Sequence, residues 1–278
     1  MVSEYRGITA FLEGRDIPDA EFDARCILEQ VTGQKLESLH ALTPEQAQSA
    51  QDMAERRAKG EPLQYILGEW EFFGMRMFVG EGVLIPRPDT EILVETVLEK
   101  CKTIRKPRII DLCTGSGCIA LALRKHLPDS EVHALDLSEA ALAYAQRNIR
   151  YHGLPVTLHQ ADVLDAQKPQ ESGTFDIIVS NPPYLTSAEM EHLQPEIRHE
   201  PASALAAGAD GLEFYRGITN VWKTALSDGG WLAFEIGEQQ GKAVAEILKQ
   251  QGFSEIQIIP DYAHHDRVVI GQKPLSRK

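Results

Sequence analysis

From Pro107 onward, short apolar segments alternate with longer amphipathic ones, and this alternation constrains the fold more than any other feature. The stretches 138–151, 211–226 and 239–251 repeat apolar residues at helical spacing, whereas the segments between them are short and β-branched. Such alternation predicts an α/β domain, with a mostly parallel sheet between two layers of helices. We expect seven strands, the last two forming an antiparallel pair at one edge: Arg108–Leu112, Glu131–Leu135, Val156–His159, Phe175–Ser180, Gly230–Ile236, Glu255–Ile259 and Arg267–Gly271.

The first 75 residues show a different pattern, that of a small helical domain. Thr43, Pro44 and Gln46 supply the N-cap, the first-turn proline and the capping-box glutamine of one helix. Residues 71–79 mix aromatic residues with a glycine, as a short hairpin does, and the prolines within 85–88 require extended backbone. We therefore predict a helical domain at 1–75, a hairpin and proline-rich linker at 76–93, and the α/β domain at 94–278.

Charge and composition argue against several classes of protein. The 278 residues carry a formal net charge of −13, and neither the first 80 residues nor the rest are basic, so we expect no direct binding of nucleic acid. No uncharged apolar run approaches the ~18 residues of a membrane span, and the first residues do not resemble a signal peptide. We expect a cytoplasmic protein with no membrane partner. The four cysteines lack zinc-ligand spacing and predict no metal site.

Residues 109–120 have the pattern of a buried strand, a glycine-bearing turn and the start of a helix. Gly115 and Gly117 allow a tight turn and let a ligand approach the backbone closely. Asp136 ends the next strand, where a carboxylate can accept hydrogen bonds from both hydroxyls of a ribose. These features predict a nucleoside-containing cofactor. The spacing of Gly115, Gly117 and Ala120 also fits the relaxed dinucleotide fingerprint, so the cofactor class stays open on this loop alone.

Two further carboxylates favour S-adenosylmethionine over a dinucleotide. Asp111 lies just before the turn, where it can hold the cationic methionine end of that cofactor and would repel a pyrophosphate. Asp162 and Val163 follow the third strand and offer a carboxylate for the adenine amino group and an apolar wall. We therefore predict that these residues, with the glycine loop and Asp136, bind S-adenosylmethionine.

Asn181, Pro182, Pro183 and Tyr184 directly follow the strand at 175–180, at the sheet edge where ligands of parallel sheets bind. The Asn181 side-chain oxygen and the Pro182 carbonyl can each accept one N–H of a planar NH2 group, and Tyr184 can stack on its flat face. Hydrogen bonds that favour a pyramidal amide nitrogen become stronger in the transition state of methyl transfer. The transfer needs no general base beforehand. We predict that Asn181, Pro182 and Tyr184 are catalytic and that Pro183 completes the substrate pocket.

This tetrapeptide resembles the signature of amino methyltransferases that act on exocyclic or amide nitrogens. Three further segments, 85–91, 200–205 with 210–212, and 261–267, are similar to the HemK/PrmC family, and the similarity covers nearly the whole chain. That family methylates the glutamine N5 of the Gly-Gly-Gln motif in peptide-chain release factors, which modulates translation termination. The resemblance implies a seven-stranded, Rossmann-like class I methyltransferase domain behind an all-helical domain that recognises the release factor.

By motif position, the resemblance also places Cys113, Thr114, Ser116 and Asn181 against S-adenosylmethionine. Two positions depart from the family pattern. Cys113 stands where members often have glycine, which leaves its backbone less free. Val163 stands where an aromatic residue is often found, which weakens the stacking expected on the adenine.

Other functions fit less of the sequence. The tetrapeptide is shared with adenine N6-methyltransferases, which the net charge of −13 disfavours. A ribosomal-protein glutamine methyltransferase is the alternative within the family, and Pro88, Asp89 and Thr90 favour the release-factor branch. A binding module that has lost activity would need a damaged glycine loop or Asn181, and both are intact. A dehydrogenase would need an acid–base group near its nicotinamide, and Tyr184 lacks the nearby lysine often used there.

Overall fold

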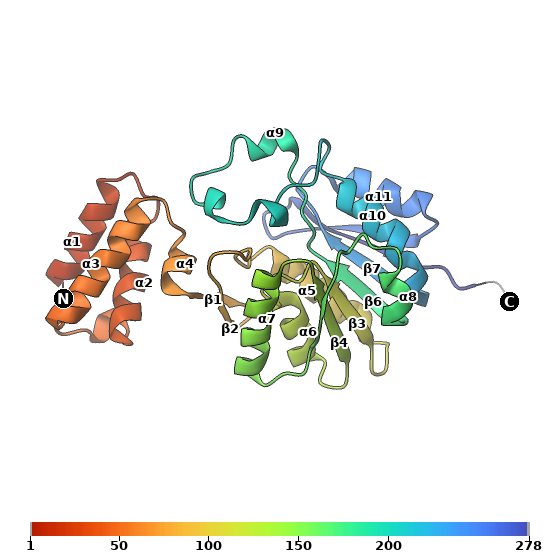
Figure 1. Cartoon of the computed structure of the whole chain (residues 1–278), viewed down its shortest axis with the longest axis horizontal. Coiled ribbons are helices and arrows are strands. Elements are labelled where there is room, and N and C mark those ends of the chain that lie inside the picture. The colour runs from red at the N-terminus through yellow and green to blue at the C-terminus, as the bar shows by residue number, and fades with distance from the viewer. Residues whose placement is uncertain (1, 277–278) are drawn as a thin grey trace.

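A computed structural model describes residues 2–276 and confirms the predicted α/β architecture (Figure 1). Residues 1, 277 and 278, at the outer ends of the predicted domain ranges, lie outside the described residues. Seven strands form one sheet in the order β5-β4-β3-β6-β7-β9-β8. Each overlaps the strand predicted for it, and their bounds are β3 Arg108–Leu112, β4 Glu131–Asp136, β5 Thr157–Gln160, β6 Phe175–Ser180, β7 Leu226–Glu235, β8 Ser254–Pro260 and β9 Asp266–Gln272.

The sheet is parallel from β5 to β7, whereas β9 runs antiparallel to both β7 and β8. The predicted antiparallel pair at one edge is confirmed, with β9 inserted between β7 and β8. The strand order reverses at β3, which has β4 on one side and β6 on the other. In open parallel sheets, ligands bind beyond the carboxyl ends of the strands at such a reversal.

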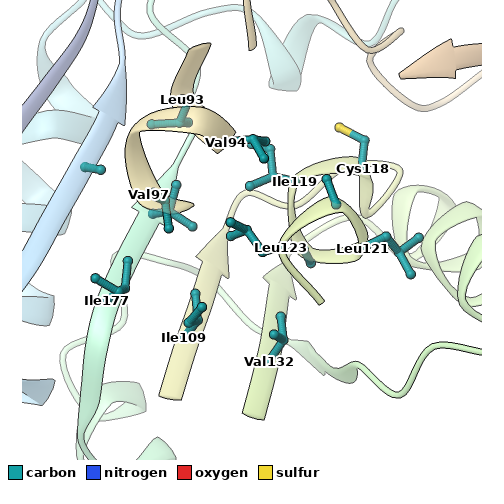
Figure 2. Close-up of a cluster of buried hydrophobic side chains, with 14 of the residues drawn as sticks. Leu93, Val94, Val97, Ile109, Cys118, Ile119, Leu121, Leu123, Val132 and Ile177 are labelled. Carbon is teal, nitrogen blue, oxygen red and sulfur yellow. The ribbon is translucent and has the colours of Figure 1, made fainter. Parts of the chain in front are cut away.

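Helices cover both faces of the sheet, and the strand side chains alternate between the two faces. Ile109 and Ile177 pack beneath α5 and α6, whose apolar side chains Figure 2 shows above the strands. Ile110 and Ile178 belong to the opposite core, under α10 and α11. The helices are α5 Thr90–Cys101, α6 Cys118–His126, α7 Glu139–His152, α8 Lys168–Ser172, α9 Ser187–Met190, α10 Glu213–Trp222 and α11 Gly241–Gln250, with 3-10 turns η2 Ile197–His199, η3 Ala202–Ala204 and η4 Lys223–Ala225.

The N-terminal helices form a separate body with its own core, built on residues such as Leu12, Ile27 and Leu28. Figure 1 shows them at one end of the molecule, away from the sheet. The predicted capping box is present, because Thr43 and Gln46 exchange hydrogen bonds at the start of α3. The predicted hairpin follows this body. The elements are α1 Val2–Glu13, α2 Ala20–Thr32, η1 Leu36–Ser38, α3 Pro44–Ala58, α4 Leu63–Leu67, β1 Glu69–Phe72 and β2 Met75–Phe78.

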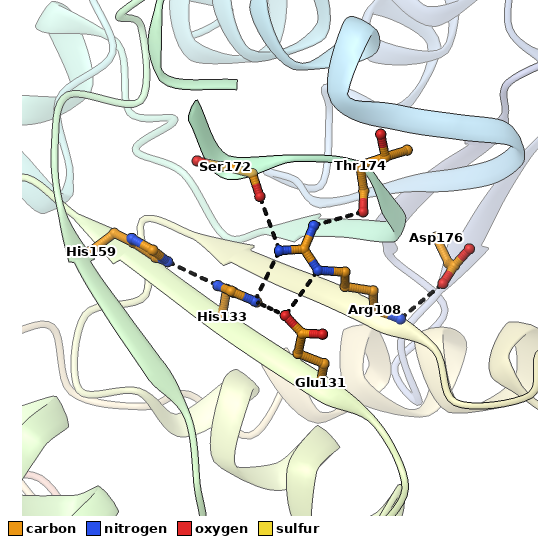
Figure 3. A network of polar contacts seen from close by, with 7 residues as sticks. All are labelled: Arg108, Glu131, His133, His159, Ser172, Thr174 and Asp176. Carbon is orange, nitrogen blue, oxygen red and sulfur yellow. Dashed lines mark hydrogen bonds and ion pairs between the residues drawn. The ribbon is translucent and has the colours of Figure 1, made fainter. Parts of the chain in front are cut away.

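A polar network joins the amino-terminal ends of the central strands, at the edge opposite the predicted site (Figure 3). Glu131 Oε1 lies 2.7 Å from His133 Nε2 and 2.9 Å from Arg108 Nε. His133 Nδ1 lies 2.9 Å from His159 Nε2, and Arg108 also donates to two backbone carbonyls before β6. The network therefore ties β3, β4, β5 and the segment before β6 together. Among residues 2–276, no helix has the length and apolar character needed to cross a membrane.

Candidate active site

A cavity of about 340 Å³ opens beyond the carboxyl ends of the central strands. The loops after β3, β4, β5 and β6 each contribute to its wall, and the segments 82–90 and 201–204 complete it. This volume lies within the range of small-molecule sites. Most of the residues predicted for the cofactor and two of those predicted for the amide, Asn181 and Pro183, therefore meet in one cavity.

The glycine loop between β3 and α6 forms one wall of this cavity. Gly115 and Gly117 have φ angles of 56° and 80°, in the left-handed region that glycine adopts without strain. A Cβ on Gly117 would lie 3.3 Å from the Ala145 Cβ, so this glycine also lets α6 approach α7. Cys113 has a φ of 60° although it carries a side chain. The departure from glycine at this position thus places a non-glycine residue in a glycine-like conformation.

Asp136, at the end of β4, holds the glycine loop and faces the cavity. Its Oδ2 accepts a hydrogen bond of 2.8 Å from the Gly115 N–H, and its Oδ1 accepts one of 2.9 Å from the Ser138 N–H. Burial raises the pKa of this carboxyl. A carboxylate oxygen can accept two hydrogen bonds, so both oxygens retain capacity for a ligand hydroxyl.

Asp111 lies behind the loop and does not contribute to the cavity wall. Its side chain is completely buried, and its Oδ2 accepts hydrogen bonds from the Thr114 hydroxyl at 2.5 Å and the Ala120 N–H at 3.3 Å. Burial raises its pKa to about 7. The structure thus gives Asp111 a role in shaping the turn, while its contact with the methionine end stays a prediction. Gly117 likewise lies outside the wall, whereas Cys113, Thr114, Gly115 and Ser116 belong to it.

Asp162 and Val163, after β5, both line the cavity. Asp162 Oδ1 accepts a hydrogen bond of 2.8 Å from the Leu164 N–H, and the Val163 carbonyl accepts one of 2.8 Å from the Trp222 indole. Phe214 of α10 lines the same cavity, so an aromatic side chain reaches it from elsewhere in the chain. Sequence reasoning missed Phe214, because nothing near residue 214 marks it as part of a site.

Two residues of the tetrapeptide after β6 line the cavity, and the other two do not. Asn181 and Pro183 line the cavity, and the Asn181 Nδ2 lies 3.4 Å from the Thr90 hydroxyl oxygen, to which it donates. Pro182 and Tyr184 lie outside the wall, and the Tyr184 ring packs against the core under α10 and α11. Burial raises the pKa of Tyr184 to about 12, so the phenol stays neutral. The predicted stacking of Tyr184 on the substrate and the acceptor role of the Pro182 carbonyl stay predictions.

The proline-rich segment 85–88 is held over the cavity by a residue from a distant part of the chain. The Glu200 side chain, almost fully buried, accepts a hydrogen bond of 3.1 Å from the Ile85 N–H and forms an ion pair with Arg87. Pro86 and Arg87 both line the cavity. The sequence shows the prolines but not their partner, because Glu200 follows more than a hundred residues later.

The residues that the structure describes include no group of three His, Cys, Asp or Glu side chains able to hold a metal ion. All four cysteines are free thiols, and Cys101 and Cys118 are buried. Burial raises the pKa of each of these two thiols to about 12, so neither is a thiolate at neutral pH. The carboxylates of Asp136 and Asp162 and the amide of Asn181 are therefore the groups of the cavity wall that the proposed chemistry uses.

Comparisons with known protein families cover both parts of the chain. Residues 5–68 match the model described as "PrmC N-terminal domain", and residues 88–210 match "Methyltransferase small domain". The chain is 46% identical over 238 residues to the release factor glutamine methyltransferase of Thermodesulfovibrio yellowstonii, covering 84% of this chain and 85% of that protein. It is 40% identical to the one from Geobacter sulfurreducens, with 94% and 93% covered.

Solved structures share the fold at much lower sequence identity. The hMettl16 catalytic domain, solved in complex with an RNA hairpin, matches with a TM-score of 0.59 at 17% identity, covering 88% of this chain and 87% of that one. A methyltransferase from Pyrococcus furiosus matches with a TM-score of 0.52 at 19% identity, covering 73% and 91%. These similarities confirm a methyltransferase fold.

Proposed function

The chain belongs to the release factor glutamine methyltransferase family, and from this premise we propose the reaction that its cavity performs. It transfers a methyl group from S-adenosylmethionine to the side-chain amide nitrogen of the glutamine in the Gly-Gly-Gln motif of a peptide-chain release factor. One observation carries the proposal: Asn181, which can accept an amide N–H, lines the same cavity as Asp136 and Asp162, which can accept hydrogen bonds from a nucleoside.

The groups around the cavity fit S-adenosylmethionine. Asp136 has free acceptor capacity for ribose hydroxyls, and Asp162 lies beside Val163 and Phe214, which offer apolar surface to an adenine. Among residues 2–276, the wall carries no lysine and one arginine, Arg87, whose charge is paired with Glu200. This set suits a cofactor without phosphates better than a dinucleotide, whose pyrophosphate needs compensating donors. When bound, S-adenosylmethionine supplies an electrophilic methyl group.

The contribution of the chain is to hold the amide nitrogen in line with that methyl group. The Asn181 Oδ1 and the Pro182 carbonyl each accept one N–H of the glutamine amide, which favours the pyramidal nitrogen of the transition state. Asp136 and Asp162 would hold S-adenosylmethionine, which would supply its methyl group to the amide nitrogen and leave as the thioether, and the methylated amide would release one N–H proton to solvent. Pro183 and Tyr184 shape the pocket and exclude water from it.

We assign recognition of the release factor to the helical domain of residues 1–75. Its separate hydrophobic core and its match to the PrmC N-terminal domain support this assignment. The net charge of −13 supports a protein partner without direct nucleic-acid contact. Because translation termination takes place in the cytoplasm, we place the enzyme there.

The test is a transfer assay with labelled S-adenosylmethionine and three acceptors: an unmethylated release factor, its variant with alanine in place of the Gly-Gly-Gln glutamine, and an adenine-containing oligonucleotide. We expect label on the wild-type factor alone. Label on the oligonucleotide, or equal label on the alanine variant, would contradict the proposed substrate.

A second assay tests the helical domain as the recognition unit. We expect a short Gly-Gly-Gln peptide to be methylated much less efficiently than the whole factor at equal concentration. Equal efficiency would show that the cavity alone selects the substrate.

A further inference from the structure

Glu235 is a buried carboxylic acid directly behind Asn181. Ser180 at the end of β6 pairs with Phe234 of β7, so Asn181, the first residue after β6, lies beside Glu235, the last residue of β7. The Glu235 side chain is not part of the cavity wall, whereas Asn181 and Thr90 are. Glu235 therefore lies outside the wall, next to two residues that form part of it.

Burial of Glu235 is nearly complete, and its charge is poorly compensated by hydrogen bonds. The residue is 1% exposed, and its Oε2 has no hydrogen-bond partner. The Thr90 hydroxyl and the Asn181 amide act on this carboxyl as hydrogen-bonding neighbours. A buried polar atom without a partner costs free energy, so its presence next to a substrate-binding amide calls for a function.

The chemistry of a carboxylate settles which end of the Asn181 amide faces it. An ionised carboxylate only accepts hydrogen bonds, so it attracts the Nδ2 of Asn181 and repels the Oδ1. The Nδ2 already points toward the Thr90 hydroxyl, at 3.4 Å. With Nδ2 directed to Thr90 and Glu235, the Oδ1 is directed to the cavity, where the proposed reaction needs an acceptor.

We propose that Glu235 is a positioning residue for methyl transfer, whose ionised carboxylate fixes the Asn181 amide with its oxygen toward the glutamine nitrogen. This inference rests on the proposed function, and it assigns to Glu235 no contact with substrate or cofactor. A protonated Glu235 can donate to the Asn181 Oδ1 and turn the amide, which would present two donors to a substrate that itself donates.

The surroundings make the ionisation of Glu235 sensitive to pH near neutrality. Burial raises its pKa to about 7, while the nearby Arg267 charge lowers it and Asp89 raises it. The titratable groups packed around Glu235 keep a single protonation state near pH 7. Burial raises the pKa of Tyr184 and of Cys118 to about 12 and that of Tyr215 well above its usual value. The guanidinium of Arg267 stays charged beside Asp261.

The experiment compares wild-type enzyme with Glu235→Gln, an isosteric variant whose amide can both donate and accept. We expect kcat for the whole release factor to fall about 10- to 100-fold, as expected for a misdirected acceptor. The dissociation constant for S-adenosylmethionine should stay within about twofold, which also shows that the variant folds. Glu238→Gln is the matched control, because Glu238 lies in the loop that follows β7, is half exposed and pairs with His265.

Two further readouts separate positioning from a general structural role. The wild-type kcat should rise as pH increases through about 7, because Glu235 ionises there, and this rise should be absent in Glu235→Gln. In the Asn181→Ala background, Glu235→Gln should cause no additional loss, because it acts through the Asn181 amide.

Each outcome decides between the two proposals. An inactive wild-type enzyme would refute the proposed function itself. Unchanged kcat in Glu235→Gln, or equal losses with and without Asn181, would overturn the role of Glu235 while leaving the function intact. A pH rise that persists in Glu235→Gln would also overturn it and would point to Asp111, whose pKa is about 7 as well.

Discussion

The Cys113 backbone adopts a left-handed conformation in which a side chain is a disadvantage. Its φ of 60° lies where a Cβ approaches the backbone closely. We expect Cys113→Gly to be more stable than Cys113→Ala by ~1 kcal/mol, the reverse of the order at ordinary positions. Both variants lose the thiol, so the difference between their free energies of unfolding reports the backbone conformation at residue 113 alone. Urea unfolding of the two variants measures this difference. A more stable alanine variant would contradict backbone strain at this position.

Asp136 and Asn181 should affect different steps of the proposed reaction. We expect Asp136→Ala to weaken S-adenosylmethionine binding at least 10-fold, because it removes the ribose acceptor and the partner of the Gly115 N–H. Asn181→Ala should lower kcat by about 100-fold with cofactor affinity nearly unchanged. Calorimetric titration and single-turnover rates measure the two effects. Equal loss of both quantities in Asn181→Ala would contradict its role.

Asp111 should make the stability of the protein depend on pH in an unusual direction. In the unfolded chain its carboxyl ionises near pH 4, whereas burial in the folded chain raises the pKa to about 7. The unfolded form therefore loses its proton first, and this carboxyl lowers the free energy of unfolding as pH rises from about 4 to about 7. Asp111→Asn removes the effect.

Urea unfolding between pH 5 and pH 8 tests this expectation. The free energy of unfolding of Asp111→Asn, taken relative to wild type, should increase up to about pH 7 and then stay level. A difference that is constant over the range would show that the carboxyl has no raised pKa.

The site residues that the sequence predicts differ from those that it does not in whether they lie at the end of a strand. Asp136, Asp162 and Asn181 each end or follow a strand, so strand assignment alone brought them to one edge. Phe214 and Glu200 reach the cavity region from a helix and an irregular segment, and only tertiary packing places them. The sequence places Asp111 just before the turn, and it lies there in β3, but the sequence does not show that its side chain turns away from the cavity.

At the scale of the elements, the carboxylate of Glu200, distant in sequence, holds the proline-rich segment 85–88 in place. Glu200 accepts from the buried Ile85 N–H and pairs with Arg87, whose side chain is partly exposed. We expect Glu200→Ala to accelerate hydrogen exchange of the Ile85 amide about 10- to 100-fold, because a bond to a charged acceptor is lost. S-adenosylmethionine should also bind more weakly, because Pro86 and Arg87 line the cavity.

Glu200→Gln is the control for this segment. This variant keeps an oxygen that can accept from the Ile85 N–H but removes the charge that pairs with Arg87. Hydrogen exchange of its Ile85 amide should therefore be faster than in wild type and slower than in Glu200→Ala. Identical exchange of the Ile85 amide in all three proteins would show that the segment is held by other contacts.

The elements of the sheet were predictable because they follow simple periodicity. All seven strands and the helices α7, α10 and α11 overlap their predicted ranges. The position of β9 between β7 and β8 was not predictable in detail, because a short connection is compatible with either order of the last two strands. Local sequence thus specifies the elements, and their pairing at the edge is decided by packing.

At the scale of the whole molecule, Arg57 links the helical body to the α/β domain through two carboxylates. Arg57 of α3 is buried, with its Nε 2.6 Å from Asp23 Oδ2 of α2 and its Nη1 3.2 Å from Glu196 Oε1 of the segment before η2. The cores on either side are separate. We therefore expect the two bodies to differ in local stability.

Asp23→Ala tests this expectation, because it leaves the buried Arg57 without its closest partner. The helical body should lose about 3–5 kcal/mol, as for other broken buried pairs. In hydrogen exchange, the amides of α1, α2 and α3 should lose protection while those of β3 and β6 keep theirs. Asp52→Ala, a change at an exposed residue of α3, is the control. Loss of protection throughout the molecule would show that both bodies unfold together.

Of the residues that the structure describes, all those that line the cavity lie at or beyond Gly82, so α1 to α4 contribute nothing to its wall. The consequence concerns how such a protein changes over evolution. With the release factor held by the helical body, as proposed above, mutations there would alter which protein is bound, while the geometry around Asn181 and Asp136 is inherited unchanged. Target choice and reaction chemistry can then diverge at separate rates within one gene, and new targets can arise without an inactive intermediate.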